Sequence, residues 1–521
     1  MPFVDPFTKL VTARLQDFFA SKTQWQRRLW GSGILLTLRE VLEASKAVRA
    51  GILHTETLGD LTAYAAALAG RDPGVGTTEN KRTLQQALKK TMVPDGVEFS
   101  TVKLVAEEIE KTYLTRWREA MVAGTHPGPE RTARAIAAHL LDSGYSSVQL
   151  HKWCTFHVRN AEGAKSLPEL LEHANALLNA KPRLYKILVG FHSVPPNKSS
   201  LPDNYLAPQA ASSWLRRNGI DVSKVRLNGA LLFHVPARDT WAAIQVTIDN
   251  VDQLISRVAL GTDSHLRPTG QAWIDNLGET FSFKRDPRLV EVHALHRESK
   301  LYSETKTSIV DAALELLGAL NFGPGSSAVA AGWAAMEALL SGPADPDVLA
   351  AERMASLVAC AFVRAELTYL SYQLQNAGGP LAAALSTCAT NRERSLTLAE
   401  AITSGQALTP SEDSDLAALE RMRRTLAAPF AALQDIQQHV ASVFRRLYRI
   451  RNLVLHGGLT DAVGLSSALR TSAPLVGAGM DRIAHAYFVD GVRPMELAAK
   501  AHIGLSLLGS KHGTSPVDLL T

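Results

Sequence analysis

The sequence predicts a mostly α-helical protein with a small α/β segment between two helical regions. Apolar residues recur at three- and four-residue spacings both before about residue 180 and after about residue 300. Between 181 and 290, short apolar runs typical of buried strands alternate with helical patterns. We therefore expect three parts, with boundaries at 1–180, 181–290 and 291–521.

The first part, 1–180, is predicted to be a helical region, and its sequence indicates no function. Residues 35–48 and 130–141 show apolar positions at helical spacing with charged residues between them. Pro129 and Glu130 suit a helix start, where a proline removes no needed donor and an acid meets unpaired N–H groups.

The second part, 181–290, is predicted to be a small α/β segment that could act as a sensor or regulatory domain. A proline- and serine-rich loop is expected at 194–209. The topology is left open. The predicted elements are strands at 185–191 (YKILVGF) and 229–236 (GALLFHVP), and helices at 210–218 and 240–260.

The third part is rich in alanine and leucine and is predicted to be helical. Pro429 separates its last two long helices, and a flexible loop is expected at 403–414. The predicted helices cover 305–320, 326–340, 346–375, 381–389, 415–426 and 431–456.

Composition narrows the class of protein. The 521 residues are 46% hydrophobic and 20% charged, with a net charge of +5, which permits a nucleic-acid partner without requiring one. Three cysteines are too few for a disulfide framework. The N-terminus has no apolar core of a secretory signal, and the longest apolar run, 355–363, is too short to span a bilayer. We expect a cytoplasmic protein without a membrane association.

Positive charge is concentrated near the end of the third part. Residues 421–458 contain seven arginines and one acid, a local charge of +6 that exceeds the surplus of the whole chain. Cationic charge focused in this way is typical of a polyanion site. An arginine-rich helix face that is merely solvated is the alternative.

Within this stretch, Arg445, Arg449, Asn452 and His456 follow one another at spacings of four, three and four and therefore share a helix face. Arg451 lies about 140° around the helix from His456. We expect Arg451 to reach the same substrate only if the helix end distorts or a second copy of the helix contributes, which favours a dimer. Arginine can clamp a phosphate and histidine can move a proton near neutral pH, although a histidine before a glycine can also be a helix cap.

The segment YRIRNLVLHGG, residues 448–458, resembles the R-x4-6-H signature of the HEPN superfamily, and its context resembles the Apea-like HEPN branch of bacterial defence proteins. Arg451, Asn452 and His456 match the signature, with the polar residue directly after the arginine. Arg449 also satisfies the spacing. Residues 332–340 resemble the early helix of that branch, with a tryptophan shortly before Glu337. The resemblance covers roughly 300–510.

This resemblance implies a helical-bundle domain that dimerises and joins two motif helices in one RNA-cleaving site. His456 is then the general acid or base, Arg451 stabilises charge on the phosphate, and Asn452 orients the phosphate or the histidine. No metal or other cofactor is expected. Arg445, Arg446, Tyr448 and Arg449 are predicted to bind RNA. Glu337 either pairs with a motif arginine or is an exposed helix residue.

The resulting hypothesis is a homodimeric endoribonuclease in antiviral (abortive infection) or toxin-type defence. Its first 300 residues would sense a trigger or hold the nuclease inactive, and a regulatory or trigger-sensing partner is a further expectation. The alternative is a non-catalytic HEPN module that binds RNA or a partner protein. A third possibility is that the α/β segment binds a nucleotide or peptide signal.

A metal site elsewhere in the chain is not predicted. His151, Cys154 and His157 offer three soft ligands at near-helical spacing. A fourth ligand is not evident nearby, and zinc sites usually show paired clusters.

Overall fold

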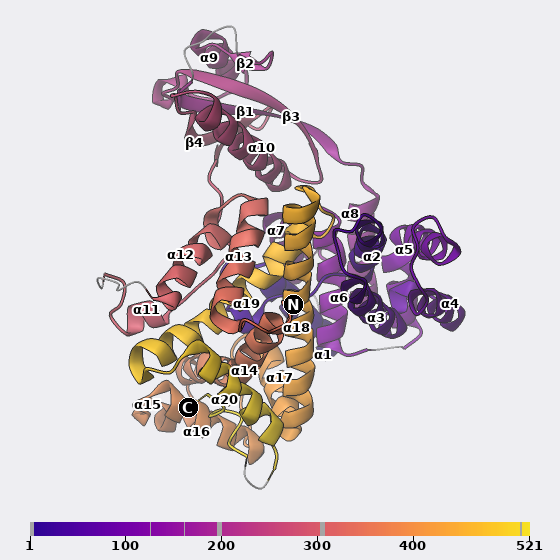
Figure 1. Ribbon diagram of the computed structural model, residues 1–521, viewed down its shortest axis with the longest axis vertical. Helices are drawn as coiled ribbons and strands as arrows, with labels where there is room; N and C mark the ends of the chain where they lie inside the picture. Colours follow the sequence, from indigo (N-terminus) through magenta and orange to yellow (C-terminus); the bar gives the residue numbers. More distant parts are fainter. Residues whose placement is uncertain are drawn as a thin grey trace. The chain divides into compact units, whose positions relative to one another are not determined.

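A computed structural model describes residues 5–124, 127–160, 162–194, 201–302, 308–510 and 513–520. Within these residues the chain forms twenty α-helices and one five-stranded sheet (Figure 1). The predicted class, mostly helical with a small sheet segment, is confirmed.

The chain divides into two compact units. The helical unit comprises Met1–Asp142, Trp153–Asn175 and Arg288–Thr521, and the sheet unit comprises Ser143–Lys152 and Ala176–Pro287. The sheet unit corresponds closely to the predicted segment 181–290. The predicted boundary between 1–180 and 291–521 is absent from this division, because both regions contribute to the same helical unit.

Eight helices lie in the N-terminal part of the chain, and the short helix η1 (Trp25–Arg27) connects the first two. The predicted helices 35–48 and 130–141 lie within α2 and α6. The eight are α1 (Pro6–Phe19), α2 (Ile34–Arg49), α3 (Thr55–Arg71), α4 (Thr78–Leu88), α5 (Val97–Val122), α6 (Pro129–Asp142), α7 (Ser147–Arg159) and α8 (Leu167–Asn179).

Ten helices follow the sheet unit. The six predicted helices all coincide with observed ones, although residues 305–307 of the first prediction lie outside the described part of the chain. The ten are α11 (Ala294–Arg297), α12 (Ile309–Phe322), α13 (Gly325–Leu340), α14 (Leu349–Ala377), α15 (Pro380–Thr387), α16 (Asn391–Thr403), α17 (Asp413–Ala427), α18 (Pro429–Gly457), α19 (Leu465–Asp490) and α20 (Pro494–Leu507).

Helix α16 was not predicted, although the sequence contains a signal for its start. The side chain of Thr390 accepts a hydrogen bond from the backbone N–H of Glu393, and the Glu393 carboxylate accepts one from the N–H of Ala389. A threonine followed three residues later by glutamate is a recognised helix-start signal. It identifies α16 better than the apolar spacing does.

Helix α14 forms much of the core of the helical unit. By length and composition it could cross a membrane, which the apolar run 355–363 alone did not indicate. However, 72% of its most apolar 18-residue window is buried inside the protein. This degree of burial is typical of a helix in a protein core.

Buried ion pairs explain why the N-terminal and C-terminal regions form one unit. Arg27 of η1 donates to Glu366 of α14 and to Asp415 of α17, at 2.7 Å in both cases, and all three side chains are buried. A buried charge without a partner is strongly unfavourable. Separation of the two regions would therefore leave buried charges without their partners.

The sheet unit is built on five antiparallel strands in the order β2-β3-β1-β4-β5. The predicted strands 185–191 and 229–236 are confirmed as parts of β1 and β3. The strands are β1 (Arg183–Ser193), β2 (Tyr205–Leu206), β3 (Gly229–Ala237), β4 (Arg267–Ile274) and β5 (Thr280–Ser282).

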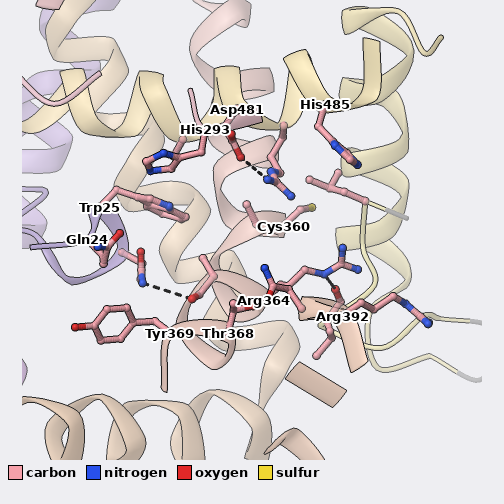
Figure 2. A pocket seen from close by; sticks show the side chains of 18 of the residues that line it. Gln24, Trp25, His293, Cys360, Arg364, Thr368, Tyr369, Arg392, Asp481 and His485 are labelled. Atoms are coloured by element: carbon pink, nitrogen blue, oxygen red, sulfur yellow. Dashed lines mark hydrogen bonds and ion pairs between the residues drawn. The ribbon is translucent and has the colours of Figure 1, made fainter. Parts of the chain in front are cut away.

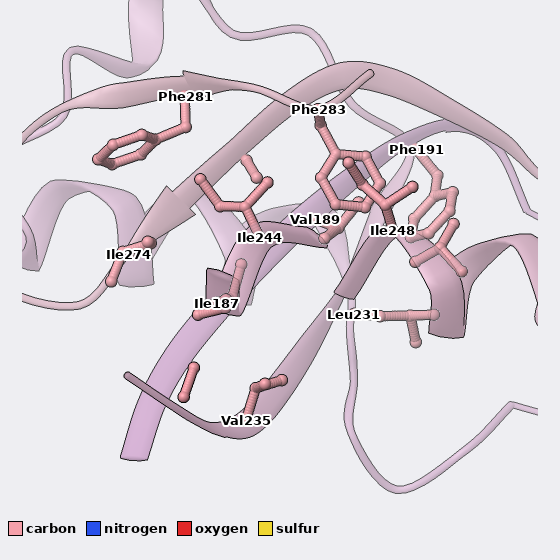
Figure 3. Close-up of a cluster of buried hydrophobic side chains, with 14 of the residues drawn as sticks. Ile187, Val189, Phe191, Leu231, Val235, Ile244, Ile248, Ile274, Phe281 and Phe283 are labelled. Carbon is pink, nitrogen blue, oxygen red and sulfur yellow. The ribbon is translucent and has the colours of Figure 1, made fainter. Parts of the chain in front are cut away.

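Alternation along β1 assigns its side chains to two cores. Ile187, Val189 and Phe191 pack with residues of α10 (Thr240–Gly261), as Figure 3 shows. Leu188 packs on the opposite face with Trp214 of α9 (Pro208–Arg217). The predicted helices 210–218 and 240–260 are thus confirmed. Of the predicted loop 194–209, residues 195–200 lie outside the described residues.

Buried His139 of α6 makes stability dependent on pH. Its ring lies against Tyr113, and burial lowers its pKa from 6.5 to about 3, with Arg39 acting in the same direction. The unfolded chain therefore binds a proton that the folded chain rejects as the pH falls below 6.5. We expect His139 to reduce the free energy of unfolding by about 2 kcal/mol at pH 5 relative to pH 7.5. His139→Gln should remove that difference in urea unfolding, and an unchanged pH dependence would contradict this.

Candidate active site

Helix α18 places the motif residues in its last two turns. Pro429 occupies a first-turn position, where its missing N–H costs no hydrogen bond. Gly458 ends the helix in the left-handed conformation, with φ of 64°. The N–H of Leu459 donates to the carbonyl of Leu453, and that of Gly458 donates to Val454, at 3.1 Å each. This glycine cap fixes the helix end directly after His456.

Arg451, Asn452 and His456 come together at this helix end. The Nη1 atom of Arg451 donates to Oδ1 of Asn452 at 2.8 Å and lies 3.3 Å from Nε2 of His456. The expectation that Arg451 requires a distorted helix or a second copy is therefore wrong. The angle of about 140° describes Cα positions, whereas the long arginine side chain reaches along the helix to the last turn.

The contact with Arg451 selects the tautomer of a neutral His456 ring. A guanidinium has donors and no acceptor. A hydrogen bond from Arg451 to Nε2 therefore requires the lone pair of that nitrogen, with the ring proton on Nδ1. His456 is exposed, Arg451 is partly exposed and Asn452 is buried at 5% exposure. The buried amide thus holds the guanidinium beside an imidazole that solvent and substrate can reach.

Tyr448 lies one turn before Asn452, but it points into the protein. Its hydroxyl donates to Oδ2 of Asp347 at 3.0 Å, and its ring lies 4.8 Å from that of buried Trp333. Burial raises the pKa of Tyr448. Because only 8% of the residue is exposed, the prediction that Tyr448 binds RNA is corrected: it anchors the motif helix to α13.

Arg446 and Arg449 are also buried, at 3% and 4% exposure. Both pair with Glu40 of α2: Nε of Arg446 lies 2.8 Å from Oε1, and Nη2 of Arg449 lies 3.1 Å from Oε2. Burial alone would raise the pKa of Glu40, but the two arginines more than offset it and the pKa is lowered. The prediction that Arg446 and Arg449 bind RNA is therefore corrected.

Arg445 is the most accessible of the four predicted RNA contacts. Its side chain is 39% exposed and pairs with Glu352 of α14, while its Nε lies 3.9 Å from Oδ2 of Asp60. Arg421 of α17 pairs with Glu366 and, at 3.8 Å, with Glu130. Most of the local charge of +6 is thus neutralised by carboxylates from distant parts of the chain, which the linear charge pattern could not reveal.

Glu337 does not serve as the partner of a motif arginine. It lies partly buried on α13, and within the described residues its carboxylate forms no ion pair with Arg445, Arg446, Arg449 or Arg451. Glu40 has that role instead. No local pattern in the sequence connects Glu40 to residues some 400 positions later.

His151, Cys154 and His157 lie on α7, where the thiol and one imidazole have other roles. Cys154 is fully buried, and burial raises its pKa to about 12. His157 accepts a hydrogen bond at Nδ1 from the N–H of Ala164, and burial lowers its pKa to about 4. Among the described residues, no group of three or more His, Cys, Asp or Glu side chains is arranged to hold a metal ion.

No protein-family model, curated protein or solved structure matches this chain. The chemistry of the residues at the end of α18 is therefore the basis for assigning a function.

Proposed function

We propose that the chain is a metal-independent endoribonuclease of the HEPN type, with its site at Arg451, Asn452 and His456. The observation that supports this most is the contact of one guanidinium nitrogen with both the Asn452 amide and Nε2 of the exposed His456. A cation and a proton acceptor at one accessible helix end are the groups that phosphodiester cleavage by a ribose hydroxyl requires.

In the proposed reaction, the phosphate draws the guanidinium of Arg451 away from His456, and the freed lone pair of Nε2 accepts the proton of the ribose 2′-OH. The 2′-oxygen attacks the adjacent phosphorus, the bond from phosphorus to the 5′-oxygen breaks, and a 2′,3′-cyclic phosphate forms. The leaving 5′-oxygen takes a proton and becomes a 5′-OH. Arg451 stabilises the negative charge that develops on the phosphate oxygens, and Asn452 keeps the guanidinium in place.

A homodimer would supply the second imidazole, which protonates the leaving oxygen. This part of the proposal rests on the resemblance to HEPN proteins, because Arg451 reaches His456 within one chain. Leu455, which directly precedes His456, is a 52% exposed apolar residue. A partner surface over this helix end would cover it.

The cations for an RNA backbone are concentrated in the sheet unit. Its residues include fourteen Lys and Arg and nine Asp and Glu, so its surplus of +5 equals that of the whole chain. We propose that this unit contributes to RNA binding. Four exposed basic residues lie in its α9 and the segment after it: Arg216, Arg217, Lys224 and Arg226.

A role in antiviral or toxin-type defence in the cytoplasm, with a regulatory or trigger-sensing partner, belongs to this proposal by analogy with the resembled family. The alternative is a non-catalytic module that binds RNA or a partner protein. The neutralisation of Arg446 and Arg449 favours the partner-binding form of that alternative, since it leaves few phosphate contacts on the motif helix.

The products of cleavage test the proposal. The purified chain, incubated with total RNA in EDTA, is expected to generate fragments with 5′-OH ends and 2′,3′-cyclic phosphates. Ends can be mapped by ligation with and without prior 5′-phosphorylation. Cleavage that needs a divalent ion, or that leaves 5′-phosphates, would contradict the mechanism. RNA binding without any cleavage would favour the non-catalytic alternative.

A further inference from the structure

A second candidate site lies in the helical unit, in a cavity of about 420 Å³ lined by residues of η1, α11, α14, α16, α19 and the segment 513–520 (Figure 2). Its α19 residues include Asp481, sixteen positions after the helix start at Leu465, or about 24 Å along the axis. His456 precedes that start. The cavity is therefore separate from the motif residues.

Four arginines line this cavity: Arg297, Arg364, Arg392 and Arg482. Two carboxylates face them. Asp518 accepts from Nε and Nη2 of Arg392, at 2.8 and 2.7 Å, and from Arg364 at 2.9 Å. Asp481 pairs with Arg297 and Arg482 and accepts from the N–H of Ala294 at 2.6 Å. These six groups therefore have a surplus of two positive charges.

The arginines of this cavity lie close enough to repel one another. Burial lowers the pKa of Arg364, and its neighbours Arg482 and Arg392 act in the same direction, against the carboxylate of Asp518. The lining residues His293 and His485 pair with Glu291 and Glu298, two carboxylates outside the cavity lining; each pair is neutral when its imidazole is protonated and carries one negative charge when it is not. An oxyanion among the arginines would relieve the repulsion between them.

The cavity also has aromatic walls. Figure 2 shows Trp25 and Tyr369 along one side and Arg364 and Arg392 along the other. The Trp25 ring stacks on Trp30, with centroids 6.3 Å apart and an interplanar angle of 21°. Trp25 is therefore held rigidly by its neighbour and can offer a face to a planar ligand.

We infer that this cavity binds a free nucleotide, with the base against Trp25 and the phosphate among the arginines. The volume lies in the range of small-molecule sites. Asp518 already bridges Arg364 and Arg392 as a carboxylate, which shows that the pair accepts an oxyanion. Nε and Nη1 of Arg482 remain as donors for a phosphate. This inference goes beyond the proposed function and does not rest on it.

Binding of ribonucleotides to the full chain, measured by calorimetry, tests the inference. We expect at least one ribonucleoside mono- or triphosphate to bind more tightly than the matching nucleoside and than inorganic phosphate. Arg482→Met, which keeps the apolar stem and removes the charge, should weaken binding by on the order of tenfold or more. Arg118→Met on α5, an exposed arginine outside the cavity, should bind as the wild type does.

Asp518→Asn should increase nucleotide affinity, an outcome that a misfolded variant would not produce. Removing this carboxylate frees donors of Arg364 and Arg392, so nucleotide affinity should rise. His456→Ala should leave affinity unchanged, which separates this site from the proposed nuclease site. Absence of saturable nucleotide binding, equal affinity for inorganic phosphate, or unchanged or weaker binding by Asp518→Asn would overturn the inference. Binding of a 5′-phosphorylated oligonucleotide without binding of mononucleotides would also overturn the inference. The cavity would then be a site for the 5′ end of an RNA.

Discussion

Replacing His456 by alanine is expected to lower the rate of RNA cleavage by a factor of about 10²–10⁴, the usual contribution of a general acid or base. His456 is the exposed member of the trio, and its Nε2 is positioned by Arg451 at 3.3 Å. In the proposed mechanism, loss of the imidazole removes the group that accepts the proton of the 2′-OH. The residue is exposed at the end of α18, so the fold should remain stable. The measurement is the initial rate on a defined RNA in EDTA.

A matched control is available on α19. His485 is partly exposed, whereas His456 is exposed, and it pairs with Glu298 at 3.0 Å. His485→Ala should therefore cleave RNA at the wild-type rate. Arg451→Lys retains the positive charge but loses the planar guanidinium that can donate two parallel hydrogen bonds to a phosphate, so it should reduce cleavage while RNA binding persists. Full activity of His456→Ala would refute the site assignment.

Replacing Glu40 by alanine is expected to reduce the free energy of unfolding by about 3–5 kcal/mol, the usual result of removing one partner from a buried ion pair. Glu40 is 1% exposed and is shared by two buried arginines, Arg446 and Arg449. Its alanine variant leaves both guanidiniums without their carboxylate. Because the pKa of Glu40 is lowered in the folded state, its contribution is present at neutral pH and is lost as the pH falls through that lowered value.

Urea unfolding at pH 7.5 measures this effect, with Glu43→Gln as the control. Glu43 lies on the same helix and accepts from the N–H of Val463 at 3.0 Å, a contact that the amide oxygen of glutamine can keep. We expect that variant to change the free energy of unfolding by less than about 1 kcal/mol. A comparably small loss in Glu40→Ala would show that the arginines find other partners.

Much of the secondary structure could be predicted because its causes are local. Apolar spacing placed α14 and α18 closely, and short apolar runs placed β1 and β3. Three strands were missed. The two-residue β2 and the three-residue β5 are too short to show a period, and β4 gathers its apolar residues at its C-terminal end. The motif trio was found through its resemblance to the HEPN signature, which Arg451, Asn452 and His456 match within two helical turns.

The arrangement of charges could not be predicted from the sequence. The local surplus of +6 indicated an RNA-binding face, yet Arg446 and Arg449 are buried against Glu40, and Arg421 meets Glu366. Each carboxylate lies tens or hundreds of residues away in the chain. Counting charge along a segment assumes that every cation faces solvent, and only the tertiary fold decides which do.

The sequence by itself thus determined the helical class, the inserted sheet segment and the position of the candidate site at the end of α18. The helical class and the sheet segment follow from backbone hydrogen bonding and side-chain periodicity, which act within a few residues, and the candidate site follows from the resemblance of a short motif to the HEPN signature. The tertiary structure alone decided that the first 142 residues belong to the same unit as the motif, which arginines are neutralised, and that Arg451 reaches His456. These depend on burial and on side-chain reach between groups that the chain brings together only when it folds.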